Sequence, residues 1–260
     1  MKQIVLIGAG NVATHLARAI DQSYPRGTLS HIYSRRHSSA LELGQQLSYC
    51  PVCVDNLQAL PTSADLYLFC TPDDSLEALW HTMPATHGGL WAHTAGSVPL
   101  DKMMAWHSKC GVLYPLQTLS KARSIDPREL PLYIEGSDEE VAARLESFAR
   151  SLSGCVYRAD SQQRGHLHLA AVLACNFTNH LLALSEDYLK RHDLDPKALY
   201  PLVRETMAKA ELYNPRSMQT GPAIRGDEET MNRHLELIQE DLLLSQIYRL
   251  LSESIRRHSR

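Results

Sequence analysis

The stretch KQIVLIGAGNVA, residues 2–13, decides the fold of this chain. A short apolar run ends in two glycines, and residues 8–13 fit the pattern G-x-G-x-x-A. Apolar residues then recur at helical spacing from Val12 to Ile20. A strand, a tight turn and a helix in this order predict the first unit of a dinucleotide-binding domain.

Each position of the glycine pattern has a physical task. Gly8 permits the tight turn that leaves the strand, and Gly10 lets the backbone approach a pyrophosphate closely. Ala13 keeps the helix close to the sheet, and the first helical residues, Asn11 and Val12, offer free N–H groups and a positive dipole to phosphates. The alternative is that the glycines serve only a tight turn.

The end of the second predicted strand identifies the cofactor. Binders of NAD usually place Asp or Glu there to accept a hydrogen bond from the ribose 2′-hydroxyl. Here the stretch HIYSRRH, residues 31–37, has no acid and offers Ser34, Arg35 and Arg36. Guanidinium and hydroxyl groups would bind a 2′-phosphate, so we expect NADP(H). The alternative is a solvated basic loop.

Alternating strand and helix patterns predict an α/β class, with a doubly wound, mostly parallel sheet. From about residue 158 only helical patterns follow, so we expect a Rossmann domain over residues 1–157 and an all-helical domain over residues 158–260. Asp195 and Asp227 are expected N-caps, the second for one helix over residues 228–255.

Composition excludes several classes of protein. Of the 260 residues 44% are hydrophobic, enough for a sizeable core, and a net charge of −3 argues against nucleic-acid binding. No uninterrupted apolar run reaches about 18 residues, so no membrane span is expected. Six scattered cysteines and no secretory signal predict a cytoplasmic protein with reduced thiols. Cys50 and Cys53 lack further ligands at fitting spacing, so no metal site is expected.

Six motifs carry a resemblance to a known family: IGAGNVATHLA, TPDDSL, HTAGS, LYPLQTLS, HLAAVLACNFTNHL and TGPAIRGD. Together they resemble the bacterial Rossmann-like proteins with a C-terminal domain of unknown function, DUF2520, which are described as proposed NADP-dependent oxidoreductases. The resemblance implies the superfamily of 6-phosphogluconate, β-hydroxyacid and ketopantoate dehydrogenases and pyrroline-5-carboxylate reductases. It further implies a substrate between the two domains and a homodimer through the helical domain.

The first long helix of the second domain holds the catalytic candidates. The resemblance implies a Lys and, one turn later, an Asn; Asn176 matches, but Val172 replaces the Lys. His168, Val172, Asn176 and Asn179 fall on one stripe about 80° wide of a regular α-helix. We expect His168 to be the proton donor and the two asparagines to orient the substrate. Alternatively, all three hydrogen-bond across the domain junction. The helix is apolar nearly all round, which predicts that it is buried.

Loops after other predicted strands supply the remaining candidates. Cys70, Thr71 and Pro72 are expected along the cofactor, and Thr94 and Ala95 beside the nicotinamide. Expected substrate contacts are Ser97, Tyr114, Gln117 and Arg225, although a turn, a packing role, or an ion pair of Arg225 with Asp227 would also explain them.

The sequence therefore predicts an NADP(H)-dependent oxidoreductase that reduces a small carbonyl or imine compound. The alternative is a non-catalytic NADP(H)-binding sensor or scaffold, and fold alone does not exclude an isomerase or hydrolase. The expected partners are a small-molecule substrate and a second copy of the chain, with no nucleic acid and no membrane.

Overall fold

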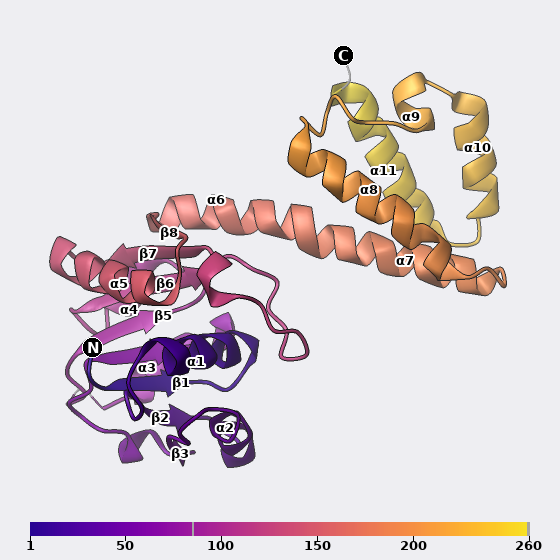
Figure 1. Cartoon of the computed structure of the whole chain (residues 1–260). Coiled ribbons are helices and arrows are strands. Elements are labelled where there is room, and N and C mark those ends of the chain that lie inside the picture. The colour runs from indigo at the N-terminus through magenta and orange to yellow at the C-terminus, as the bar shows by residue number, and fades with distance from the viewer. Residues whose placement is uncertain (85, 259–260) are drawn as a thin grey trace. The chain divides into compact units, whose positions relative to one another are not determined.

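A computed structural model of the chain describes residues 1–84 and 86–258 (Figure 1). These residues form two compact units, residues 1–180 and residues 181–260. The first unit contains the whole sheet and the beginning of the long helix, so the helix does not begin at a boundary between units. The α/β class and the helical C-terminal part predicted from the sequence are confirmed.

An eight-stranded sheet forms the centre of the first unit, with the order β3-β2-β1-β4-β5-β6-β7-β8. All neighbouring strands run parallel except β6 and β7, which are antiparallel. The strands are β1 (Ile4–Ile7), β2 (Leu29–Tyr33), β3 (Val52–Val54), β4 (Leu66–Phe69), β5 (Leu90–His93), β6 (Cys110–Pro115), β7 (Leu132–Gly136) and β8 (Val156–Arg158). The chain leaves β1 towards β2 on one side and later returns to β4 on the other, which creates a topological switch point where ligands bind in such sheets.

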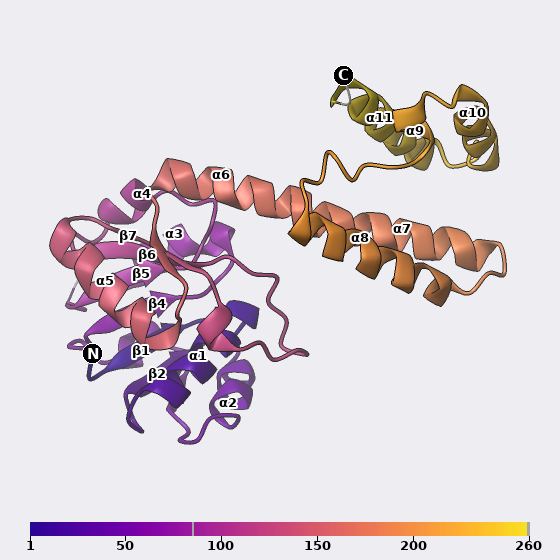
Figure 2. The ribbon, with the colours of Figure 1, turned by 45° about the horizontal axis from the view of Figure 1, so that its top comes forward.

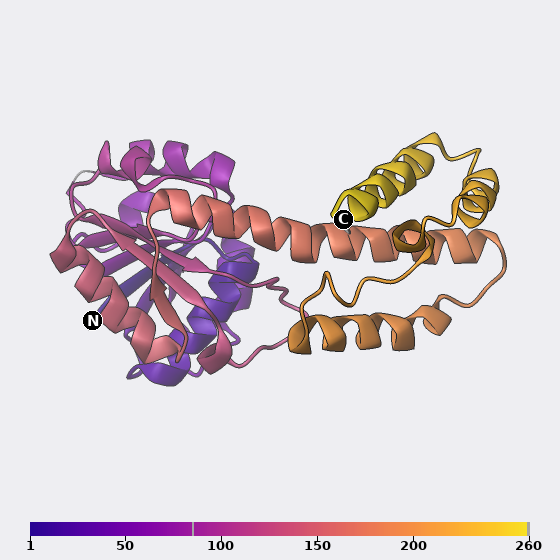
Figure 3. The same cartoon turned by 90° about the horizontal axis from the view of Figure 1, so that it is seen from above.

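Helices cover both faces of this sheet, as the view along it in Figure 3 shows. Buried residues of α1, α2 and α5 pack on the face that holds Ile4 and Leu6, whereas α3 and α4 pack on the face that holds Val5 and Ile7. The strands alternate their side chains between the two cores because successive residues point to opposite faces. The helices are α1 (Asn11–Ser23), α2 (His37–Gly44), α3 (Asp73–Thr82), α4 (Leu100–Met104) and α5 (Glu139–Leu152), with short 3₁₀ turns η1 (Leu57–Ala59) and η2 (Pro127–Glu129).

A buried ion pair fixes the start of the long helix to the sheet. Arg164 in α6 (Ser161–Ala171) is 1% exposed and pairs with Glu135 of β7. It also donates to the Val98 carbonyl at 2.6 Å, while the Ser161 hydroxyl donates to the Glu135 carboxylate at 2.9 Å. An Asp160 capping box closes the first turn. These contacts explain why the first turns of the helix belong to the sheet unit.

The helix continues from α6 through a π-helical segment, η3 (Val172–Phe177), into α7 (Thr178–Arg191). A π turn holds more residues than an α turn, so side chains beyond Val172 lag behind their positions in a regular α-helix. The single stripe of His168, Asn176 and Asn179 calculated for an α-helix therefore does not extend unchanged through this segment.

The long helix is not covered within one chain, which corrects the prediction that it is buried. Leu169, Leu173 and Phe177 are 58%, 55% and 55% exposed. The segment Ser161–Arg191 contains an 18-residue window whose mean hydropathy is 1.4, and by length and composition this segment is able to cross a membrane. The sequence prediction required an uninterrupted apolar run, whereas a window average also admits segments with polar residues in them. Helices packed inside proteins meet the same criteria of length and composition.

Beyond residue 180 the second unit is helical, and α9, α10 and α11 pack together in it (Figure 2). Asp195 and Asp227 cap η4 and α10, as predicted, by accepting from Lys197 N and Thr230 N. The prediction of one helix over residues 228–255 is wrong, because the chain breaks and Asp241 accepts from Leu244 N. The elements are η4 (Pro196–Leu199), α8 (Tyr200–Leu212), α9 (Pro222–Arg225), α10 (Glu228–Leu237) and α11 (Leu242–His258).

We predict that Glu135→Gln lowers the free energy of unfolding by about 3 kcal/mol, because the buried Arg164 guanidinium loses its carboxylate. Glu139→Gln is the matched control, since its ion pair with Arg158 is exposed and should contribute nothing measurable. Urea denaturation followed by the fluorescence of the buried Trp80 and Trp91 measures both variants. Equal midpoints would contradict the role given to the buried pair.

Candidate functional site

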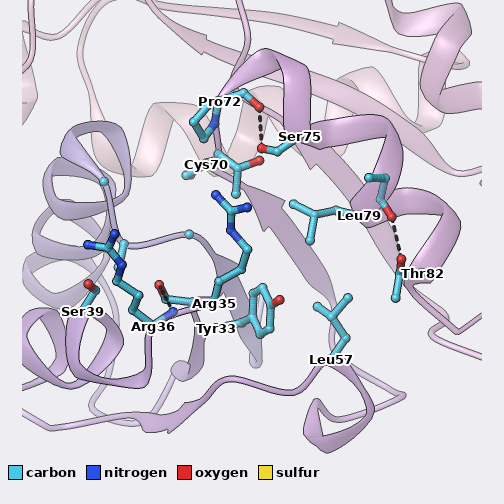
Figure 4. A pocket seen from close by; sticks show the side chains of 16 residues that line it. Tyr33, Arg35, Arg36, Ser39, Leu57, Cys70, Pro72, Ser75, Leu79 and Thr82 are labelled. Carbon is cyan, nitrogen blue, oxygen red and sulfur yellow. Dashed lines mark hydrogen bonds between the residues drawn. The ribbon is translucent and has the colours of Figure 1, made fainter.

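A cavity of about 790 Å³ lies at the carboxyl ends of β1, β2 and β4, the switch point of the sheet (Figure 4). It brings together eight of the residues predicted to bind the cofactor, which are Gly8, Gly10, Ser34, Arg35, Arg36, Cys70, Thr71 and Pro72. The rest of its lining consists of Ala9, Tyr33, Ser39, Leu57, Ser75, Ala78, Leu79 and Thr82.

The two glycines differ in what surrounds them. Gly8 has φ +121°, and a Cβ there would lie 2.3 Å from the carbonyl oxygen of Cys70, so no larger residue fits. A Cβ at Gly10 would meet no described atom within 4 Å. Gly8 is thus required by the approach of the β1 and β4 loops, whereas Gly10 leaves open space on the cavity side. That space is where a close backbone approach by a phosphate needs a glycine.

The N-terminus of α1 is prepared for an anion. Its N-cap is Gly10, and within the described chain no side chain caps it and no acidic residue occupies its first turn. The N–H groups of this turn and the helix dipole are therefore available to phosphate oxygens. Asn11 faces a different partner, because its side-chain oxygen accepts from Lys121 N at 3.2 Å. Val12 is half-buried and Ala13 is buried against the sheet.

Thr71 contributes a buried hydroxyl that lacks a partner among the described residues. It lines the cavity beside Pro72, so a bound group that enters the cavity would supply the missing hydrogen bond. Cys70 also lines the cavity, but burial raises the pKa of its thiol to about 12, which keeps it neutral. The open space at Gly10 and the unpaired Thr71 hydroxyl both fit a dinucleotide.

The two arginines after β2 lie differently in the cavity. Figure 4 shows Arg35 reaching across towards Cys70 and Pro72, while Arg36 and Ser39 lie side by side at another wall. Arg36 is the N-cap of α2, and its backbone N–H donates to the Ser34 hydroxyl at 3.4 Å. Arg36, Ser39 and Ser34 together therefore form a small cationic cradle at a second helix start.

An apolar wall closes the opposite side, and the sequence reasoning missed it. Leu57 follows β3, and Ser75, Ala78, Leu79 and Thr82 project from one face of α3. Their spacing of three, one and three residues is the signal that identifies a helix face. The same spacing equally describes a face packed in the core, so sequence alone could not assign it to a cavity.

His93 is the last residue of β5, and Thr94 and Ala95 begin the loop after it; all three lie outside the lining of the cavity. Burial, with a smaller effect from Arg164, lowers the pKa of His93 to about 3, so the ring is neutral. Its Nδ1 accepts from Ala95 N at 3.2 Å, and the Thr94 hydroxyl donates to the Phe69 carbonyl at 3.2 Å. These contacts hold the loop rigidly but give His93 no means of exchanging a proton at neutral pH.

His168 contacts a residue predicted from a distant motif. The Tyr114 hydroxyl at the end of β6 lies 3.1 Å from His168 Nδ1, and the rings meet edge to face with centroids 6.1 Å apart. Gly96 packs against both, since a Cβ there would lie 2.6 Å from His168 Nδ1 and 2.9 Å from Tyr114 Cε2. The structure thus joins one predicted catalytic residue and one predicted substrate contact.

The other predicted residues lie apart from this pair or make local contacts. The Ser97 hydroxyl donates to the Asp73 carboxylate, and the exposed Gln117 side chain accepts from Thr118 N at 2.8 Å. Asn176 and Asn179 are exposed and have no hydrogen-bond partner among the described residues. Arg225 belongs to the second unit, where its guanidinium lies 3.9 Å from Asp227, the ion-pair alternative.

Comparison with known proteins identifies a family and several proteins of similar fold. Residues 130–255 match the family model "Domain of unknown function (DUF2520)". A crystal structure of a proposed NADP oxidoreductase from Bacteroides fragilis is 40% identical and covers 98% of both chains with a TM-score of 0.88. A reductive aminase from Aspergillus terreus, in complex with NADPH and ethyl levulinate, is 14% identical, with 100% of this chain and 95% of that chain covered and a TM-score of 0.73, and therefore shares the fold.

A curated relative matches a shorter segment. An L-aspartate dehydrogenase from Nitrosopumilus maritimus is 37% identical over 60 residues, which span 23% of this chain and 22% of the dehydrogenase. Nicotinamide-dependent oxidoreductases are thus found among the relatives in sequence and in fold, while none of them establishes the substrate of this chain.

We predict that alanine at Gly8 mainly lowers stability, whereas alanine at Gly10 mainly affects dinucleotide binding. Gly8→Ala should lower the free energy of unfolding by about 1–3 kcal/mol, because the methyl group meets the Cys70 carbonyl in a left-handed backbone conformation. Gly10→Ala should change stability by less than about 1 kcal/mol but prevent dinucleotide binding. Thermal denaturation and calorimetry with NADPH measure the two effects. NADPH affinity that is unchanged in Gly10→Ala would exclude this cavity as the pyrophosphate site.

Proposed function

Because this chain belongs to the DUF2520 family, we propose that it binds NADP(H) and reduces a small carbonyl or imine compound. The observation that carries the proposal is the cavity at the switch point. Its lining includes an uncapped helix start, the open side of Gly10, the unpaired Thr71 hydroxyl and two arginines. The relationship to a proposed NADP oxidoreductase and the fold shared with an NADPH-bound reductive aminase support the same cofactor.

The two arginines would have separate tasks. Arg36, with Ser34 and Ser39, suits the 2′-phosphate, because charge-assisted hydrogen bonds and the α2 N-terminus both favour an anion there. Arg35 reaches across the cavity and suits the face of the adenine, which would lie against Leu79 on the other side.

We predict that Arg36→Ala weakens NADPH binding about 10- to 100-fold, because the hydrogen bonds of a charged group are lost, and leaves NADH binding unchanged. Arg35→Ala is the matched variant and should weaken both cofactors by a similar factor, since the adenine is common to them. Calorimetric titration of each variant with each cofactor measures these effects. Equal affinity of the unaltered protein for NADH and NADPH would disprove NADP(H) selectivity.

The nicotinamide end would lie beside the loops after β4, β5 and β6, where parallel sheets of this topology bind their ligands. When bound, the reduced nicotinamide supplies a hydride. The chain must then place a proton donor at the developing oxyanion or amine, and His168 with its Tyr114 contact is the group proposed for it. Asn176 and Asn179 would orient the substrate, and Thr94 and Ala95 would offer backbone groups to the nicotinamide.

A non-catalytic NADP(H) sensor is the second candidate, because Val172 stands where a Lys would act in related dehydrogenases. NADPH oxidation measured with a panel of ketones, aldehydes and cyclic imines separates the two. A reductase consumes NADPH with at least one member. A sensor binds the cofactor, reduces none of them and changes its oligomeric state on binding.

We also propose that two copies of the chain pair through the long helix, and that the protein acts in the cytoplasm, where NADPH is available and its six cysteines remain free thiols. Leu169, Leu173, Phe177 and Leu181 form an exposed apolar strip on this helix. Such a strip normally marks a protein interface. A second copy suits it, because a buried apolar helix was predicted and one chain does not bury it.

Phe177→Glu combined with Leu173→Glu should convert the dimer into monomers, since each copy would place two charges in the apolar contact. Tyr49→Glu, which is exposed on the sheet unit, should leave the dimer intact. Light scattering after size-exclusion chromatography measures the mass of each variant. A monomeric unaltered protein would disprove the dimer.

A further inference from the structure

Tyr114 is buried in the core on the face of the sheet that α3 and α4 cover, but apolar packing does not explain the partner of its hydroxyl. Its side chain is 7% exposed, yet its hydroxyl makes a hydrogen bond with His168 at 3.1 Å instead of with a backbone group. His168 is half-buried, whereas Tyr114 is buried. A buried phenol beside a half-buried imidazole is an arrangement that can pass a proton inwards.

The loop after β5 is shaped around this pair. Gly96 cannot carry a side chain, because a Cβ would overlap the imidazole of His168 and the ring of Tyr114. Both rings therefore pack on the backbone of the loop that the fold places at the nicotinamide end.

Burial keeps the Tyr114 hydroxyl protonated. Burial raises the pKa of the phenol above its usual value, Asp73 of α3 and Tyr133 of β7 raise it further, and Arg164 of α6 opposes them. The nearby His93 at the end of β5 is neutral. The phenol is therefore a proton donor at neutral pH and not a base.

We propose that the Tyr114 hydroxyl is the group that protonates the substrate, and that His168 positions this hydroxyl and restores its proton. This inference rests on the proposed reductase function and assigns the direct contact to Tyr114 instead of His168. Tyr114 is then a catalytic residue, and His168 acts through it.

As the substrate carbon receives the hydride with its electron pair, the π pair of the C=O or C=N bond moves to the oxygen or nitrogen. That atom takes the phenolic proton, which leaves a phenolate on Tyr114. A protonated His168 returns a proton from Nδ1 and is recharged from solvent.

The protonation state of His168 also decides the direction of the hydrogen bond. A protonated ring donates from Nδ1 to the Tyr114 oxygen, which frees the phenolic hydrogen to point towards a substrate. A neutral ring with a bare Nδ1 would accept that hydrogen and withdraw it.

The test uses the panel member that the unaltered protein reduces fastest. Tyr114→Phe should lower kcat about 10²- to 10⁴-fold and leave NADPH affinity unchanged. His168→Gln keeps a donor to the hydroxyl but cannot return a proton to it, so kcat should fall less than in Tyr114→Phe and its pH profile should differ from that of the unaltered protein. His166→Gln, an exposed neighbour on the same helix, is the control and should keep both the rate and the pH profile.

A second readout needs no turnover. The ¹⁵N resonances of the His168 ring should shift in Tyr114→Phe, while those of His166 should not. Four results would overturn the inference: an unchanged kcat in Tyr114→Phe, an equal loss at every pH in His168→Gln, an unshifted His168 resonance, or loss of NADPH binding in Tyr114→Phe. If the unaltered protein reduces no member of the panel, the reductase function fails, and the inference fails with it.

Discussion

The close approach of Gly8 to the Cys70 carbonyl is the constraint on which the candidate site depends. β1 and β4 are neighbours in the sheet although more than fifty residues separate them, and their loops meet at the switch point. Only a residue without a Cβ and with a left-handed backbone fits between them. Because Gly8 turns there, α1 begins at Asn11, after its N-cap Gly10, with free N–H groups facing the cavity that Thr71 also lines.

A second constraint, the buried ion pair of Arg164 and Glu135, determines where His168 lies. It attaches the first turns of α6 to β7 and the loop before α4, which places His168 one turn later on the glycine loop after β5. The glycine cavity and the Tyr114 pair are thus both parts of the sheet unit. The unit boundary lies inside the long helix and not at the last strand, because the first turns of this helix are attached to the sheet.

The residues predicted for the cofactor end lie together around one cavity, whereas those predicted for the chemical end are more scattered. A glycine pattern and a pair of arginines are local signals, because their function follows from the backbone of a few consecutive residues. The apolar wall of α3 was missed because a cavity face and a core face have the same helical period. The stripe of polar residues on the long helix was calculated for regular α geometry, and the π segment at Val172–Phe177 changed their relative angles. The prediction that this helix is buried was also wrong for a single chain. Hydropathy indicates that an apolar face needs to be covered but does not say which chain covers it.

The sequence by itself determined the α/β class, the first glycine turn, the basic end of β2 and the helical character of the C-terminal part. Each of these depends on neighbouring residues through backbone sterics, hydrophobic period or charge. Only the tertiary structure decided that Tyr114, Gly96 and His168 meet, because three segments separated by up to 72 residues are brought together by strand order and by one buried ion pair. Contacts of that kind arise from packing in three dimensions, which no local pattern in a single sequence records.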